Sequence, residues 1–297
     1  MNYEWHEFNN LQSAAQLTGY LDGREYTHGS YCHYTRLGII DSILAKNTFQ
    51  LSCVSGFNDK MDTIQFADPR RFYSLCFSTG VNENLSLWYL YSGMQGHGGR
   101  IRFTENSVRK LIESSTYTLW EYPPNDRSKA TPFCALQPCD YRAVFRDILY
   151  ARNTPERVSL KYNTMTNYKL SPEELRKYRA GSPGFTKSIV WYYEKETRYL
   201  IELQDSVLNR MNPEMQYYVA MEFSDAVKAM LFVGFAPEIT SIEKELTDYP
   251  HIAKLSPRKL ELSEYSGTVE MKLCDKCVHY LTLHNCKQNG CSGYPKL

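Results

Sequence analysis

Apolar residues recur at helical spacing in some segments of the chain and alternate with polar residues in others. Residues 8–21 show the helical spacing, and a second helix is expected from Leu37, with Thr35 as its cap. Alternation predicts a strand at 49–53, and the run Phe-Tyr-Ser-Leu-Cys-Phe-Ser predicts another at 72–78. The same patterns predict helices at 85–94, at 105–115 and from Ser171, and strands at 31–34, 100–103, 116–122, 140–150, 215–223 and 229–235.

The order of these elements indicates the fold class. Helices and strands do not alternate regularly, so an α+β fold is favoured over a doubly wound parallel sheet. Residues 123–134 and 152–170 are expected to be loops or insertions, and 185–203 mixes helix and strand character. A chain of 297 residues can bury one large core, or one core with a small appendage.

Composition and charge exclude some classes of protein. The hydrophobic content of 42% is that of an ordinary globular protein, and the net charge of +1 creates no field that would draw the whole chain to nucleic acid or to an anionic membrane. No stretch approaches 18 apolar residues, so no transmembrane helix is expected. The first residues lack the pattern of a secretory signal, which favours a cytoplasmic location and reduced cysteines.

Nine cysteines fall into two groups. Five are scattered, several of them in apolar surroundings typical of reduced core thiols: Cys32, Cys53, Cys76, Cys134 and Cys139. The other four gather within 18 residues near the C-terminus, together with His279 and His284: Cys274, Cys277, Cys286 and Cys291. Four such ligands suit a tetrahedral structural zinc. Reduced thiols or a redox pair remain the alternative, and nearby lysines also allow a knuckle that contacts nucleic acid or a protein partner.

Several common catalytic motifs are absent from the sequence. It has no phosphate-binding loop of the Gly-x-x-x-x-Gly-Lys type and no Gly-x-Gly-x-x-Gly between a strand and a helix. It also lacks a Gly-x-Ser-x-Gly elbow and a His-Glu-x-x-His helix. Any chemistry must therefore come from a less common set of residues.

Three segments combine polar and aromatic residues in a way that suggests a site. The first is His33-Tyr34-Thr35, the second runs from 75 to 98 with Trp88 and Tyr91, and the third runs from 185 to 198. Each segment alone has a structural explanation. A histidine on a strand is usually hydrogen-bonded, and the spacing of the two aromatic residues is typical of a core helix. Glu196 in the third segment could pair with Lys187 or Arg198 on a solvated strand.

Taken in order, the segments resemble the bacterial domain of unknown function 2971 family, over roughly residues 31–240. The matching motifs are His33-Tyr34-Thr35, Asn58-Asp59, Cys76-Phe77-Ser78, Trp88 with Tyr91, His97-Gly98, Lys187, and Trp191 through Tyr193, Glu194 and Glu196 to Arg198. One departure follows Asn58-Asp59, where the family continues Pro-x-Glu and this chain has Lys60-Met61-Asp62.

That family is in turn similar to the ADP-ribosyltransferase superfamily, in particular its His-Tyr-Glu class. The resemblance implies a split antiparallel β core with flanking helices over residues 1–240. It leaves 241–297 as a C-terminal extension, with the predicted zinc knuckle at 274–291. It also implies that NAD is the substrate.

The resemblance assigns roles to individual residues. Glu196 is the expected carboxylate at the sugar, and Glu194, on the same face of a predicted strand, acts on the acceptor. His33 is the expected NAD anchor and a member of the catalytic set. The remaining NAD contacts implied are Tyr34, Thr35, Ser78, Trp88 and Tyr91. The class places its tyrosine on the strand that here reads Cys76-Phe77-Ser78, so Tyr91 or Ser78 is expected to replace it.

The function expected from the sequence is NAD-dependent ADP-ribosyl transfer to a protein or nucleic-acid target. A toxin or a phage-defence effector with an antitoxin or regulatory partner is the expected setting. Three alternatives stay open: an NAD glycohydrolase with the same site, a non-catalytic nucleotide-binding module, and a nucleic-acid-binding protein that uses the cysteine cluster.

Overall fold

The computed structural model describes residues 3–57, 63–80, 83–92, 97–154 and 157–266. It contains two compact units, each built from three stretches of chain. The first unit comprises Met1–His28, Thr48–Thr79 and Val108–Ser224, and the second comprises Gly29–Asn47, Gly80–Ser107 and the described residues from Asp225 on. The two units are therefore interleaved along the sequence.

Seven antiparallel strands form the main sheet of the first unit, in the order β7–β12–β3–β2–β13–β5–β6. On β2, Phe49 and Leu51 are fully buried, whereas Gln50 and Ser52 are exposed, so alternation along this strand gives the sheet one buried face. The strands are β2 (Thr48–Cys53), β3 (Phe72–Thr79), β5 (Thr116–Tyr122), β6 (Thr131–Leu136), β7 (Tyr141–Asp147), β12 (Glu196–Leu203) and β13 (Gln216–Glu222). Short helices in this unit are η1 (Val54–Gly56), η2 (Pro69–Arg71), η3 (Arg127–Lys129) and α8 (Asp205–Leu208).

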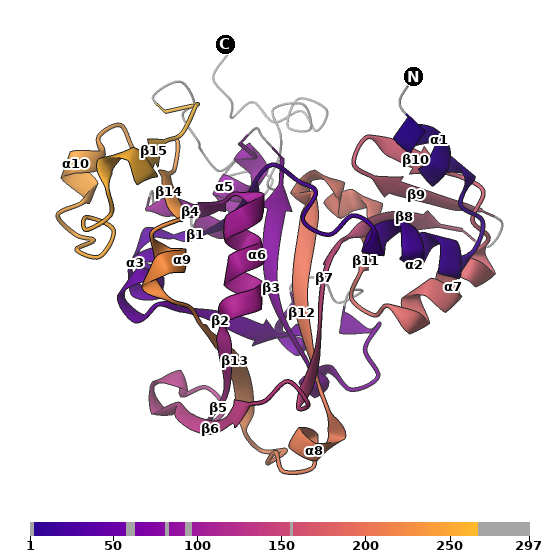
Figure 1. Cartoon of the computed structure of the whole chain (residues 1–297), viewed down its shortest axis with the longest axis horizontal. Coiled ribbons are helices and arrows are strands. Elements are labelled where there is room, and N and C mark those ends of the chain that lie inside the picture. The colour runs from indigo at the N-terminus through magenta and orange to yellow at the C-terminus, as the bar shows by residue number, and fades with distance from the viewer. Residues whose placement is uncertain (1–2, 58–62, 81–82, 93–96, 155–156, 267–297) are drawn as a thin grey trace, which may run out of the picture. The chain divides into compact units, whose positions relative to one another are not determined.

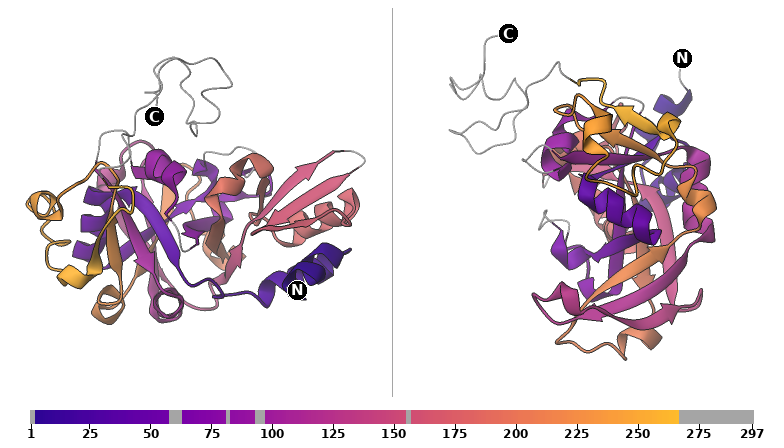
Figure 2. Two further views of the ribbon diagram at one scale, coloured as in Figure 1. Left: turned by 90° about the horizontal axis from the view of Figure 1, so that it is seen from above. Right: turned by 90° about the vertical axis from the view of Figure 1, so that its left-hand side faces the viewer.

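A second sheet in the same unit has the order β10–β9–β8–β11, with β11 parallel to β8. Its strands are β8 (Leu149–Asn153), β9 (Val158–Tyr162), β10 (Met165–Asn167) and β11 (Thr186–Ser188). Helix α1 (Tyr3–Asn10) contacts β10, and α2 (Ala14–Asp22) contacts α7 (Pro172–Gly181) (Figure 1). In the left view of Figure 2, the indigo N-terminal helices lie at the same end as the pink strands of this sheet. Phe8, Leu17, Leu149, Leu160 and Leu175 are fully buried here, and each such side chain contributes about 1.5–3 kcal/mol.

The second unit has its own four strands, in the order β1–β4–β14–β15. Helix α3 contacts β4, and α5 contacts β1. The Asp41 carboxylate accepts the backbone N–H groups of His251 and Ile252 at 2.7 and 2.9 Å, which ties the late segment to α3. The elements are β1 (Tyr31–Arg36), α3 (Leu37–Lys46), α5 (Leu85–Ser92), β4 (Gly98–Phe103), α9 (Asp225–Lys228), β14 (Phe232–Phe235), α10 (Ile242–Glu245), η5 (Pro257–Lys259) and β15 (Leu260–Leu262). Helix α6 (Glu105–Ser114) runs across the division at Ser107.

The α+β class with mainly antiparallel pairing is confirmed, whereas several element predictions are wrong. The stretches 123–134 and 152–170 contain strands β6, β9 and β10 rather than loops only. The helix expected at 8–21 is two helices, because Ser13 caps α2 in a reciprocal capping box with Gln16. Thr35 does not cap α3, since β1 continues to Arg36, which is the N-cap residue.

Three further expectations concern the chain as a whole. The domain boundary expected at residue 240 stays a prediction, and β15, which lies beyond it, pairs with β14. None of the helices in the described ranges is both long and apolar enough to cross a membrane. The five cysteines in those ranges form no disulfide.

Candidate functional site

The two glutamates of the third segment lie on different elements. Glu194 ends the 3-10 helix η4 (Ile189–Glu194), and Glu196 is the first residue of β12. Lys195 between them adopts a left-handed conformation with φ 45°. The prediction of a continuous Glu194-Lys195-Glu196 strand is therefore wrong. A helix end and a left-handed residue, not strand alternation, place the two glutamates.

Lys187 on β11 brings the two carboxylates together. Its Nζ lies 2.6 Å from Glu194 Oε2 and 2.7 Å from Glu196 Oε2. All three side chains are at least nine-tenths buried. One buried ammonium group is thus shared by two buried carboxylates.

Arg198 contacts both oxygens of the Glu196 carboxylate, with a longer contact of 3.3 Å from Nη2 to Oε2. The two residues share one face of β12, and Arg198 Nε donates to Glu196 Oε1 at 2.5 Å. Arg198 Nη1 donates to the Gly184 carbonyl at 2.7 Å. Gly184 has φ 82°, and a Cβ there would lie 2.5 Å from Phe66 Cζ, so this turn requires glycine.

The neighbouring strand β3 supplies two further polar contacts. Ser78 lies directly opposite Glu196, and its hydroxyl donates to the Glu194 carbonyl at 2.7 Å. The Cys76 thiol hydrogen-bonds with the Glu196 carboxylate. The backbone N–H of Glu196 donates to the Tyr150 hydroxyl at 2.8 Å. Glu196 is thus fixed by contacts to its side chain and to its backbone.

The charges of this cluster control its protonation. Burial alone would raise the pKa of Glu196, but the positive charges of Arg198 and Lys187 outweigh it and hold that pKa well below its ordinary value. Burial would lower the pKa of Lys187, and the negative charges of Glu196 and Glu194 reverse this and raise it. Burial raises the pKa of the Cys76 thiol. The cluster therefore combines ionised Glu196 and Lys187 with a neutral thiol.

The residues expected to bind NAD, apart from Ser78, lie in the second unit. His33, Tyr34 and Thr35 are on β1, and Trp88 and Tyr91 are on α5. Trp88 is fully buried, and its Nε1–H donates to the Glu83 carboxylate at 3.1 Å. The Tyr34 ring packs edge-on against the Trp88 ring, with 4.9 Å between the ring centres.

Tyr34, Tyr91 and His33 differ in how far their side chains are exposed to solvent. The Tyr34 hydroxyl accepts the Asn84 backbone N–H at 3.2 Å, and burial raises its pKa to about 12. Tyr91 is 39% exposed, and His33 is half-buried. The NAD-binding roles of all these residues stay predictions.

Sequence reasoning identified part of the charged cluster. The alternative in which Glu196 pairs with Lys187 or Arg198 is confirmed for both partners, but the cluster is buried and not solvated. Tyr150 and Gly184 were not expected to contribute. The Pro183-Gly184 break was a visible signal, whereas Tyr150 lies 46 residues from its partner and gives no local signal.

The predicted metal ligands Cys274, Cys277, Cys286 and Cys291 lie outside the described residues, as does Asn58-Asp59. Within the part of the chain that the structure describes, no group of three or more His, Cys, Asp or Glu residues could hold a metal ion. The zinc knuckle stays a prediction.

No family model matches the chain, and no curated protein matches it. The solved structure of Thermus sp. 2.9 DarT in complex with NAD+ is similar, with a TM-score of 0.31 and 10% identity, over 79% of this chain and 94% of that chain. The same protein in complex with ADP-ribosylated ssDNA gives a TM-score of 0.32 and 10% identity, over 80% and 95%. Likeness at these TM-scores does not establish a shared fold. The resemblance to the domain of unknown function 2971 family stays a prediction from the motifs.

Proposed function

We propose that this chain binds NAD and transfers its ADP-ribose group, with Glu196 and Glu194 as the acting carboxylates. The observation that carries the proposal is the pair of buried carboxylates that share Lys187 at 2.6 and 2.7 Å. A carboxylate held ionised away from water is the group that stabilises a developing positive charge most strongly.

The chemistry requires one carboxylate at each reacting partner. The bond between nicotinamide and ribose breaks, its electron pair leaves with nicotinamide, and positive charge develops on the sugar. Glu196 stabilises that charge. The acceptor then forms a bond to the sugar carbon, and its proton passes to Glu194. The two roles follow the sequence resemblance, in which the second glutamate acts at the sugar.

Lys187 has to change partners for this reaction to proceed. Arg198 contacts both oxygens of Glu196 and Lys187 contacts Oε2 as well, so the charge of Glu196 is offset by two cations. If Lys187 binds Glu194 alone, Glu196 keeps one cation, and its Oε2, then held only by the 3.3 Å contact from Arg198 Nη2, can turn toward the sugar. The short distance from Lys187 to Glu194 makes this exchange a small movement.

The proposed NAD contacts come from the sequence resemblance. His33 anchors the nicotinamide ribose, and Tyr91 stacks on the nicotinamide ring. The other proposed contacts are Tyr34, Thr35, Ser78 and Trp88. A protein or a nucleic acid is the proposed acceptor, in the setting of a toxin or a phage-defence effector.

A second candidate is a non-catalytic module in which the cluster is structural. The balanced charges favour it, because two cations already neutralise two carboxylates. In that case NAD or another nucleotide binds without turnover. An NAD glycohydrolase would use the same carboxylates with water as the acceptor.

Incubation of the full chain with NAD labelled in the adenosine part separates these functions. The proposal expects nicotinamide release together with label on a macromolecule. Release of free ADP-ribose alone would instead indicate the glycohydrolase. NAD binding without nicotinamide release would indicate the non-catalytic module and contradict the proposal.

A further inference from the structure

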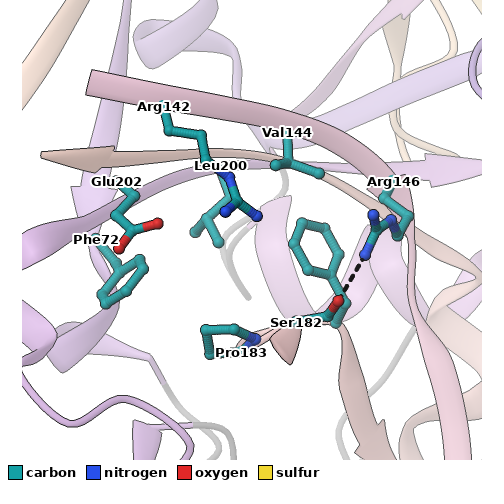
Figure 3. A pocket seen from close by; sticks show the side chains of 9 residues that line it. Phe72, Arg142, Val144, Arg146, Ser182, Pro183, Leu200 and Glu202 are labelled. Carbon is teal, nitrogen blue, oxygen red and sulfur yellow. Dashed lines mark hydrogen bonds between the residues drawn. The ribbon is translucent and has the colours of Figure 1, made fainter. Parts of the chain in front are cut away.

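A small hollow lies on the main sheet of the first unit, on the face that carries Glu196 and Arg198. Its base is formed by Phe72, Val144 and Leu200, which lie on three adjacent strands (Figure 3). Its remaining lining residues are Arg142, Arg146, Ser182, Pro183, Phe185 and Glu202. Because Arg146 lies directly opposite Arg198 across β7 and β12, the hollow adjoins the carboxylate cluster without sharing its residues.

Arg146 is the fixed charge of the hollow. It is only 7% exposed, and its Nη1 donates to the Ser182 hydroxyl at 2.9 Å (Figure 3). Its Nη2 pairs with Asp22, and its guanidinium lies 5.2 Å from the centre of the Phe185 ring. The Nε group is buried and finds no hydrogen-bond partner among the described residues. Because the Nε atom is closed off from solvent, a ligand in the hollow would meet the remaining N–H groups of Nη1 and Nη2 instead.

Two further donors accompany Arg146. The Ser182 hydroxyl accepts from Arg146, which leaves its own O–H free to donate. Arg142 lies on the same strand and the same face as Arg146, four residues earlier. It is exposed and offers a planar fork of N–H groups. Within the described residues no ion pair joins Arg142 to Glu202, although the two are directly opposite on β7 and β12.

We propose that this hollow is a binding site for a phosphate group. The donors Arg142, Arg146 and Ser182 suit an acceptor-only tetrahedral oxyanion. The charged lining, two arginines against Glu202, is net positive by one. Asp22, which is half-exposed and outside the lining, pairs directly with Arg146 and offsets its charge, so the attraction for an anion falls mainly to Arg142. The inference does not depend on the proposed transfer reaction.

The phosphate could belong to a separate phosphomonoester or to NAD itself. Both sources present the same oxygen atoms to the arginines. They differ in whether NAD competes for the site, so competition distinguishes them.

Calorimetric titration of the full chain with inorganic phosphate tests the site, at pH 7.5 and with chloride holding the ionic strength constant. Wild type is expected to bind phosphate, and Arg142→Gln to bind it at least about tenfold more weakly, the effect of losing one charge-assisted contact. Arg142 is exposed, so its variant keeps the fold. Arg152→Gln, at an exposed arginine on β8, is the matched control and should bind as wild type does. Arg146→Lys keeps the charge but loses the fork and should also bind more weakly.

Titration with AMP and with NAD, in the presence of phosphate, then identifies the source. Displacement of phosphate by NAD in wild type, together with weaker direct binding of NAD by Arg142→Gln than by Arg152→Gln, would place an NAD phosphate in the hollow. Competition by AMP alone would indicate a separate phosphomonoester ligand. Wild type that binds phosphate no better than chloride, or Arg142→Gln that binds it as wild type does, would overturn the proposal.

Discussion

Lys187 is the residue on which the charged cluster depends most. It is buried between Glu194 and Glu196, and it is the cation that the two share. Buried charges are stable only when paired, because removal from water costs several kcal/mol for each ion. Loss of this ammonium group would leave Glu194 without the ion pair it makes here and Glu196 with Arg198.

Lys187→Met is therefore expected to lower the free energy of unfolding by about 3 kcal/mol, measured by urea denaturation. Lys195→Met is the matched control, since Lys195 is exposed and lies between the same two glutamates. It should change the free energy by less than about 0.5 kcal/mol. Equal effects of the two substitutions would contradict the pairing seen at Lys187.

At this scale the sequence indicates the types of residue in the cluster but not their geometry. Glu194, Glu196, Lys187 and Arg198 were all visible in the third segment. Their convergence was not, because it depends on the left-handed backbone of Lys195, and a lysine gives no signal for that conformation. Burial also escaped prediction, since a run of charged residues ordinarily indicates solvent exposure.

Among the elements, the turn between α7 and β11 has the most specific requirement. Gly184 adopts φ 82°, its carbonyl accepts from Arg198, and Phe66 occupies the space where a Cβ would lie. The turn therefore links backbone conformation to the position of the arginine that holds Glu196.

Gly184→Ala is expected to destabilise the chain by about 1–2 kcal/mol from backbone strain, with a further loss from the clash with Phe66. Gly181, at the end of α7, has open space around it. Gly181→Ala should leave the free energy of unfolding unchanged, or raise it by up to about 1 kcal/mol. Thermal and urea unfolding of both variants would make the comparison, and a stable Gly184→Ala protein would contradict the strain.

Elements with a long, regular pattern were predictable, and short ones were not. Strand β2 and helix α3 matched their apolar periodicity, and β3 matched its run of aromatic and apolar residues. Strand β10 has only three residues, too few for alternation to be recognised. The capping box of Ser13 and Gln16 was present in the sequence and separates α1 from α2, but the apolar spacing ran across it.

In the molecule as a whole, each compact unit is assembled from three separate stretches of sequence. No local sequence pattern reveals this arrangement. In the second unit, the late residues Glu261 and Ser263 hydrogen-bond to Arg102 and Glu83, and β15 pairs in parallel with β14. A boundary at residue 240 would separate these partners.

A chain that ends at residue 240 is accordingly expected to lose amide-exchange protection in β14, whereas a chain that ends at residue 266 should keep it. Both lack residues 267–297, so the comparison isolates 241–266. Hydrogen exchange followed by mass spectrometry would measure it. Equal protection in the two shortened chains would instead support the boundary expected from the sequence.

The cysteine cluster near the C-terminus provides a test of metal binding by the whole chain. The full chain is expected to hold one zinc ion through Cys274, Cys277, Cys286 and Cys291, and the chain that ends at residue 266 to hold none. Metal analysis of the purified proteins, with Cys274→Ser as a point variant, would test this. Equal zinc in the full and shortened chains would rule out the knuckle.

In the proposed reaction, Glu196 acts on the sugar of NAD. The most direct measurement is the rate of nicotinamide release from NAD by wild type, Glu196→Gln and Glu194→Gln, each checked for folding by circular dichroism. Wild type should release nicotinamide, and Glu196→Gln should release it at least about a hundredfold more slowly. Glu194→Gln should reduce transfer to the acceptor more than nicotinamide release. No release by wild type, or equal release by wild type and a folded Glu196→Gln, would contradict the claim.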